Sequence, residues 1–263
     1  GPDSALCRRD TRARPHRAGT VRIACINKAR PPLGVSMARL TRAMQKCFDR
    51  YFLPVWGYPV RLYNTKKAKP TDWQLIYFED ADQAGALGYH ALTKNGQPVS
   101  KVFVKTTIED GELVSVTACH ELFEMVIDPL ANLWAQASHG REFAYEMCDA
   151  VEEDTFMVDG IAMANFVYPS WFEPFKHRRG TKYDHMGLLS APFTMSKGGY
   201  TVVKKKGRVK ERYGSLAKAS RFAKERRHGH RSEYRKGDDG LHIPRKPARP
   251  RAKRHWKEAR APA

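Results

Sequence analysis

The sequence is poor in cysteine and contains no long apolar run. Its five cysteines are an odd number, and no two of them form a CxxC pair. This usage does not support a disulfide framework and favours a reducing compartment. No stretch approaches the roughly 20 apolar residues of a membrane-spanning helix, so we expect no membrane partner. The basic N-terminus lacks the apolar core of a secretory signal peptide. We therefore expect a cytoplasmic protein that is not exported through such a signal.

Basic residues are concentrated at both ends of the chain without a matching number of acidic residues, and this excess produces the net charge of +19. Residues 196–263 contain 23 Lys and Arg against 6 Asp and Glu, and residues 1–20 contain 5 against 2. The part between them, 21–195, is nearly neutral, with 19 basic and 20 acidic residues. Binding to a polyanion is therefore expected from the ends of the chain and not from its middle.

The composition divides the chain into three segments. Residues 1–19 are a basic arm, 20–203 have the composition of a folded domain, and 204–263 are a Lys- and Arg-rich tail. Such a tail is expected to have no core of its own and to be largely irregular. Aromatic residues lie between its cations and could stack on bases, so the tail predicts sequence-independent binding of nucleic acid through phosphate contacts. Docking on an acidic protein surface, or on a larger assembly such as a virion, is the alternative.

Residue periodicity within 20–203 predicts an α/β (α+β) fold. Strand segments are recognised by alternation and β-branched residues, and helices by apolar residues three to four positions apart. Ser36 is suited to cap the first helix, and Pro129 ends the second at the residue before it. We expect strands at 20–29, 59–63, 72–78 and 101–106, helices at 36–51, 115–128 and 142–151, and a hairpin within 156–169.

The helix expected at 115–128 is apolar on almost every side, which is typical of a buried helix. Its middle nevertheless carries His120, Glu121 and Glu124. Burying two carboxylates and an imidazole is costly unless something compensates. A divalent cation compensates, because imidazole and carboxylate are both good zinc ligands. The pattern is that of the HExxH metal-binding helix with Glu124 at the second histidine position. A half-exposed helix with a solvated acidic face is the alternative.

A second acidic segment supplies candidates for a third metal ligand. Glu146 follows His120 by 26 residues, and Asp149 lies one helical turn further on. Either carboxylate could complete a zinc site, and Asp149 could instead orient the histidine as a hydrogen-bond partner. The sequence leaves this choice open, as it leaves open another divalent metal in place of zinc. Cys148, which lies between the two carboxylates, is interpreted as a core residue, as is Cys119.

Five blocks of sequence occur in a familiar order. Together they resemble a family of largely uncharacterised bacterial and bacteriophage proteins with a zincin-like, metallopeptidase-like domain. The resemblance covers roughly residues 20–203 and implies a mixed sheet packed on an active-site helix. It also implies that Glu121, Glu124, Glu146, Asp149 and Glu152 lie with His120 in the family's motif blocks. Glu124 departs from the standard zincin pattern, which has histidine there. The blocks are DQAGALGYHALTKNGQPVSKVFVKT, TACHELFEMVIDPLANLW, AYEMCDAVEEDTF, NFVYPSWF and APFTMSKGGY.

A hydrolytic role would make Glu121 the general base, because it adjoins the metal ligands without being one. Hydrolysis also needs a donor for the developing oxyanion. His90 and Tyr168 are the first candidates, followed by His139 and His185, and each could instead be an ordinary core or surface residue. We therefore expect a zinc-dependent hydrolase, in particular a peptidase. The alternative is a non-enzymatic structural or virion protein with a degenerate zincin-like site.

Overall fold

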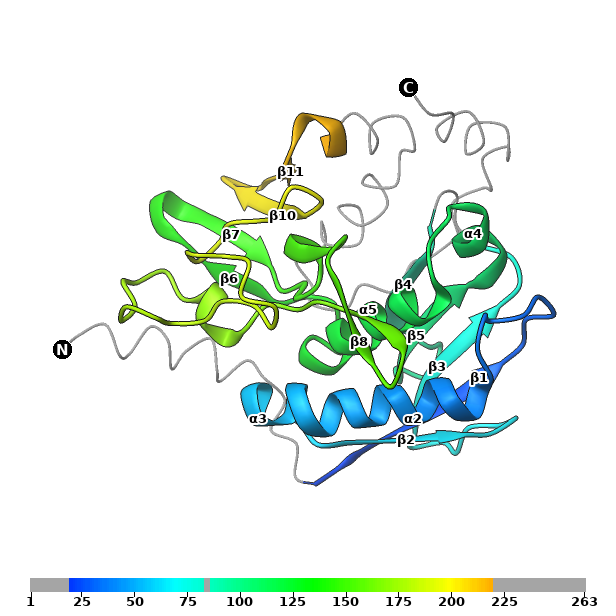
Figure 1. Cartoon of the computed structure of the whole chain (residues 1–263). Helices are drawn as coiled ribbons and strands as arrows, with labels where there is room; N and C mark the ends of the chain where they lie inside the picture. The colour runs from blue at the N-terminus through cyan, green and yellow to red at the C-terminus, as the bar shows by residue number, and fades with distance from the viewer. Residues whose placement is uncertain (1–18, 83–85, 220–263) are drawn as a thin grey trace.

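The computed structural model describes residues 19–82 and 86–219 (Figure 1). They form a mixed α/β structure in which two sheets and a hairpin surround one central helix. The predicted fold class is confirmed at this level. Residues 1–18 of the basic arm and 220–263 of the basic tail lie outside the described residues. No helix within the described ranges is long and apolar enough to cross a bilayer.

The larger sheet has five strands in the order β2-β1-β3-β5-β4. Neighbouring strands are parallel except β4, which runs antiparallel to β5 at one edge. The strands expected at 20–29, 59–63 and 72–78 are confirmed. The bounds are β1 Val21–Asn27, β2 Val60–Asn64, β3 Trp73–Phe78, β4 Gly88–Leu92 and β5 Pro98–Phe103.

The strand expected at 101–106 is only partly correct. β5 ends at Phe103, and the chain continues directly as the short helix α4, Val104–Glu109. Val104 and Thr107 are both fully buried. Residues three apart share a face in a helix but point to opposite faces in a strand, so the helical turn buries both side chains on one side.

Two helices pack against the larger sheet and confirm the expected helices at 36–51 and 115–128. Helix α2 begins after Ser36, whose hydroxyl accepts a hydrogen bond from the Arg39 amide at 3.3 Å. Helix α5 is buried along its whole length because β4 and β5 cover one side of it and β9 covers another. The helical segments are α2 Met37–Cys47, η1 Phe48–Phe52, α3 Leu53–Trp56 and α5 Val114–Ile127.

The second sheet is antiparallel, with the order β11-β10-β7-β6, and lies on the other side of α5 from the first (Figure 1). A separate hairpin, β8 and β9, packs across α2 and α5 and confirms the hairpin expected within 156–169. The bounds are β6 Trp134–Gln136, β7 Arg141–Ala144, β8 Thr155–Val158, β9 Ile161–Ala164, β10 Tyr200–Lys205 and β11 Arg208–Tyr213, with short helical turns η2 Ser138–Gly140, η3 Asp149–Val151 and η4 Pro169–Phe172.

The helix expected at 142–151 is wrong. Its first part is strand β7, and only η3, a single turn, is helical at its end. β7 pairs with β10, which lies more than fifty residues later, and Phe143 fills the core between the sheets with no exposed surface. This pairing partner is remote in sequence, so local periodicity could not reveal it. Glu146 consequently lies in the loop after β7 and Asp149 at the start of η3, so the two do not share one helix face.

The structured part of the chain continues past residue 203. β11 pairs along its length with β10, and the following turn brings Lys218 into the interior. The Lys218 ammonium lies 2.7 Å from a carboxylate oxygen of Glu152 and 3.1 Å from one of Glu153. These contacts hold the turn around Lys218 against Glu152 and Glu153, which closely follow Asp149 in the chain.

Candidate metal centre

The centre of the site is a histidine held between two carboxylates. His120 Nε2 lies 3.0 Å from Glu124 Oε1 on the next turn of α5 and 3.0 Å from Asp149 Oδ1 at the start of η3. The three side chains are 6%, 1% and 3% exposed. The structure thus brings together three of the four residues that the sequence suggested as metal ligands.

The fourth suggested ligand, Glu146, pairs with a different histidine. Its carboxylate lies 3.2 Å from His90 Nε2, and both side chains are nearly buried. His90 is the middle residue of β4 and stands opposite Ser100 of β5. The Ser100 hydroxyl donates a hydrogen bond to the Glu121 carbonyl oxygen at 2.9 Å, which ties this part of the sheet to α5.

A glycine allows β4 to lie directly against α5. A Cβ atom at Gly88 would come within 2.6 Å of the Lys101 carbonyl oxygen and 3.1 Å of Glu121 Cγ. Both distances are shorter than an ordinary van der Waals contact, so any larger residue would push the strand away from the helix. The place of His90 beside the α5 carboxylates therefore depends on the absence of a side chain at position 88.

Two overlapping groups of these buried side chains could hold a metal ion. One consists of His120, Glu124 and Cys148, and the other of His90, Glu124 and Glu146, with potential ligand atoms within 4.8 Å of one another in each group. Cys148 is buried, as expected of a core residue, but it also lies at the site, and its backbone N–H donates to Glu124 Oε1 at 3.3 Å. The sequence signal for this role was its position between the two acidic residues of the loop.

Crowding of carboxylates and imidazoles shifts the pKa values of the cluster. Burial lowers the pKa of His120, but the charge of Glu124 and the hydrogen bond to Asp149 outweigh burial and raise this pKa well above its usual value. Burial also lowers the pKa of His90, but the charge of Glu146 outweighs burial and raises this pKa. Burial and the Asp149 charge raise the pKa of Glu124 well above its usual range. In the absence of a cation, the cluster therefore retains protons that isolated groups would have lost.

Glu121 lies beside both histidines. It is 2% exposed, and its negative charge contributes to raising the pKa of both His90 and His120. Like Asp149, it belongs to neither of the two ligand groups, but it is Asp149 whose carboxylate contacts His120 Nε2, at 3.0 Å. A carboxylate in the position of Glu121 can exchange a proton with a molecule bound at the site without giving up a metal ligand.

Asp128 is a further charged residue near the site and was not predicted from the sequence. It is fully buried at the end of α5, where its carboxylate accepts hydrogen bonds from the backbone N–H groups of Asn132 and Leu133, each at 3.1 Å. Its charge also contributes to raising the pKa of His90. An aspartate directly before a proline at a helix end was the available signal.

The other proposed oxyanion donors lie elsewhere in the described structure. His139 is exposed in the turn between β6 and β7. Tyr168 and His185 both pack against Phe166, with ring centroids 5.9 and 5.2 Å from it. Burial and the charge of Asp184 raise the pKa of Tyr168, whereas burial and the charge of Lys182 lower the pKa of His185 against the opposing charge of Asp184. Of the four candidates, His90 alone belongs to one of the two ligand groups.

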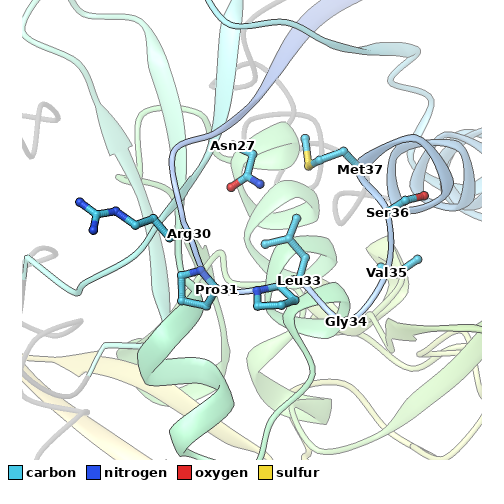
Figure 2. Close-up of a pocket in the computed structure, with 9 residues that line it drawn as sticks. Asn27, Arg30, Pro31, Leu33, Gly34, Val35, Ser36 and Met37 are labelled. Atoms are coloured by element: carbon cyan, nitrogen blue, oxygen red, sulfur yellow. The ribbon is translucent and has the colours of Figure 1, made fainter.

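A surface pocket lies on the loop that leads from β1 into α2 (Figure 2). Its lining consists of Asn27 and residues 30–37, with Leu33 reaching into the core. None of these residues belongs to the two ligand groups. The chemistry of the buried cluster, and not the size of this pocket, therefore determines where we place the site.

Comparisons with family models, with curated protein sequences and with solved structures each find no match to this chain.

Proposed function

We propose that the chain is a metal-dependent hydrolase with a zincin-like domain, and that its cation is held by His120, Glu124 and Asp149. The observation that carries the proposal is the contact of one imidazole nitrogen with two carboxylate oxygens, 3.0 Å from each, on buried side chains. Neighbouring ligands of one small cation have to approach each other this closely. The arrangement also explains why an apolar helix carries these polar residues at its centre.

The donor set fits zinc. Imidazole nitrogen and carboxylate oxygen are common zinc ligands, and three protein ligands leave a position for substrate or water in a four-coordinate site. When bound, such a cation supplies Lewis acidity that activates water and polarises a carbonyl group. The two buried carboxylates favour a positive charge between them, and a bound cation would supply that charge in place of the proton on His120.

Within this proposal the surrounding side chains have separate roles. Glu121 accepts a proton from the attacking water and delivers it to the leaving group. His90, whose pKa is raised, is available as a hydrogen-bond donor to a developing oxyanion. A peptide is the proposed substrate, because the sequence blocks around these residues resemble those of metallopeptidase-like domains.

The test is a comparison of hydrolysis by the wild type and by Glu121→Gln against a broad peptide library. Removing a general base costs about 10²- to 10⁴-fold in rate, so we expect at least about a hundredfold loss with the bound metal retained. Glu109→Gln is the matched control, because Glu109 is exposed on α4, and it should keep full activity. Loss of the metal in Glu121→Gln, or full activity without Glu121, would contradict the assignment of roles.

One observation favours a second function, a structural metal site in a non-enzymatic or virion-associated protein. The cluster is closed: Glu146 is the most exposed side chain of the two histidine–carboxylate pairs, at 10%. Cys148 lies close enough to add a fourth ligand. Structural zinc sites are fully coordinated and closed, whereas catalytic ones keep an open position. Under this alternative the wild type would bind metal but hydrolyse no member of the peptide library, and chelation would lower its thermal stability.

We also propose that the basic tail, residues 204–263, binds nucleic acid without sequence preference. The described part of the tail, residues 204–219, supports nucleic-acid binding because five cations are exposed on the β10–β11 hairpin. Because β11 completes the second sheet, a truncation should follow residue 219. Binding of DNA and RNA to the full chain should fall steeply with salt, and truncation should weaken it at least about tenfold. No binding by the full chain at low salt would overturn this proposal, and equal binding by both proteins would assign the binding to the β10–β11 hairpin, which the truncated protein keeps. The five cations are Lys205, Lys206, Arg208, Lys210 and Arg212.

A further inference from the structure

The Glu124 carboxylate stands between two histidine–carboxylate pairs. On one side it contacts His120 at 3.0 Å, and His120 in turn contacts Asp149. On the other side it falls within one ligand group with His90 and Glu146, which are themselves 3.2 Å apart. Each pair therefore offers one imidazole and one carboxylate, and the two pairs share Glu124. A carboxylate has two oxygens and can bind a different cation through each.

The second pair, His90 and Glu146, is also buried and held in place by the fold. His90 comes from the edge strand β4 and Glu146 from the loop after β7, so two different elements converge on Glu124. The side chains of His90 and Glu146 are 4% and 10% exposed. Gly88 brings β4 against α5 by a contact that no larger residue would permit. An imidazole and a carboxylate held in this way are removed from water, which is costly unless a charge compensates.

The charges of the cluster match two divalent cations better than one. Four carboxylates, those of Glu121, Glu124, Glu146 and Asp149, carry a total charge of about −4 when ionised, and imidazoles must be neutral to bind metal. One divalent cation would neutralise about half of this negative charge. Two such cations would neutralise it. The charge of Glu121 acts on both histidines, so Glu121 would lie beside both cations.

We infer that the cluster binds two divalent cations, one at His120 and Asp149 and one at His90 and Glu146, with Glu124 as the shared ligand. The first of these positions rests on the proposed function. The second is a separate cation site, with nitrogen and oxygen ligands that suit zinc, manganese or iron. His90 is then a metal ligand and not an oxyanion donor.

The experiment measures metal content of the full chain after loading with excess zinc and removal of unbound metal by dialysis. We expect two zinc ions per chain in the wild type and one in His90→Ala. His120→Ala should also retain one. His139→Ala is the matched control, because His139 is exposed on the β6–β7 turn, and it should keep two. Circular dichroism establishes that each variant is folded.

A second measurement does not depend on any variant. The manganese-loaded wild type should show the exchange-coupled electron paramagnetic resonance spectrum of a close pair, since two metal ions that share ligands lie about 3.5–4 Å apart. One ion per chain with an uncoupled six-line spectrum overturns the second site. If that single ion is lost in His120→Ala and kept in His90→Ala, the proposed function survives. If it is lost in His90→Ala alone, the proposed metal ligands are wrong as well. No bound metal in the wild type overturns both.

Discussion

Replacement of Lys218 with methionine tests whether the C-terminal strands are an integral part of the domain that carries the metal centre. The Lys218 side chain is only 2% exposed, and its ammonium contacts Glu152 at 2.7 Å and Glu153 at 3.1 Å. These two residues follow Asp149 by three and four positions. Methionine keeps most of the buried aliphatic volume and removes the charge, so the variant isolates the ion pairs.

The expected magnitude follows from how buried each partner is. Removing one partner of a fully buried ion pair costs about 3–5 kcal/mol, because the other charge is left without compensation. Here Glu152 and Glu153 are 16% and 38% exposed, so water can partly replace the lost ammonium. We therefore expect the free energy of unfolding of Lys218→Met to fall by about 2–3 kcal/mol, below the fully buried limit.

Lys204→Met is the matched control. Lys204 contacts Glu142 at 3.2 Å on the same sheet, but its side chain is 21% exposed and Glu142 is 27% exposed. Pairs of this kind contribute about 0–1 kcal/mol. Equilibrium unfolding in urea, with unchanged m-values, gives both differences. If Lys218→Met costs no more than Lys204→Met, then the buried ion pairs of Lys218 do not stabilise the docking of the segment after β11 on Glu152 and Glu153.

Three further predictions follow. Gly88→Ala should lower the unfolding free energy by about 1–3 kcal/mol, because its Cβ would lie 2.6 Å from the Lys101 carbonyl oxygen; an unchanged urea midpoint would disprove the close approach. Burial and the Lys182 charge lower the pKa of His185 below its usual 6.5. Between the lowered pKa and 6.5, the folded protein therefore binds fewer protons than the unfolded chain. Its stability should fall as the pH decreases through 6.5 toward the lowered pKa. His185→Phe should therefore lose less thermal stability than the wild type between about pH 8 and pH 5, and equal losses would refute this. Finally, zinc affinity should rise with pH, because the raised pKa of His120 keeps it protonated above its usual range and the cation must displace that proton. Calorimetry in buffers of different ionisation enthalpy would reveal this proton release, and its absence would contradict the shift.

Sequence patterns predicted the elements whose signals are local. Ser36 and the apolar spacing after it identified α2 and its cap, and the largely apolar segment without Gly or Pro that ends at Pro129 identified α5. A buried helix with ionisable residues at its centre was also visible in the sequence, and this led to His120 and Glu124. Asp149 was one of two alternatives, and the contact with His120 at 3.0 Å favours it over Glu146 as the partner of that histidine.

Features that depend on distant pairing could not be read from the sequence. The segment 142–151 has a helical composition, but β10 supplies a strand partner that overrides this preference. The contact between His90 and Glu146 spans 56 positions and requires β4 and the loop after β7 to converge on α5. No local pattern contains that information. The role of Gly88 was hidden for the same reason, since its neighbours Lys101 and Glu121 are brought to it only by the fold.

Anomalous diffraction from crystals of the zinc-loaded protein tests the central claim most directly. Data collected above and below the zinc absorption edge locate the metal without assumptions about its ligands. The account predicts an anomalous difference peak about 2.0–2.2 Å from His120 Nε2, Glu124 Oε1 and Asp149 Oδ1. A map with no peak between these three atoms, or with zinc bound only at exposed histidines such as His139, would contradict it.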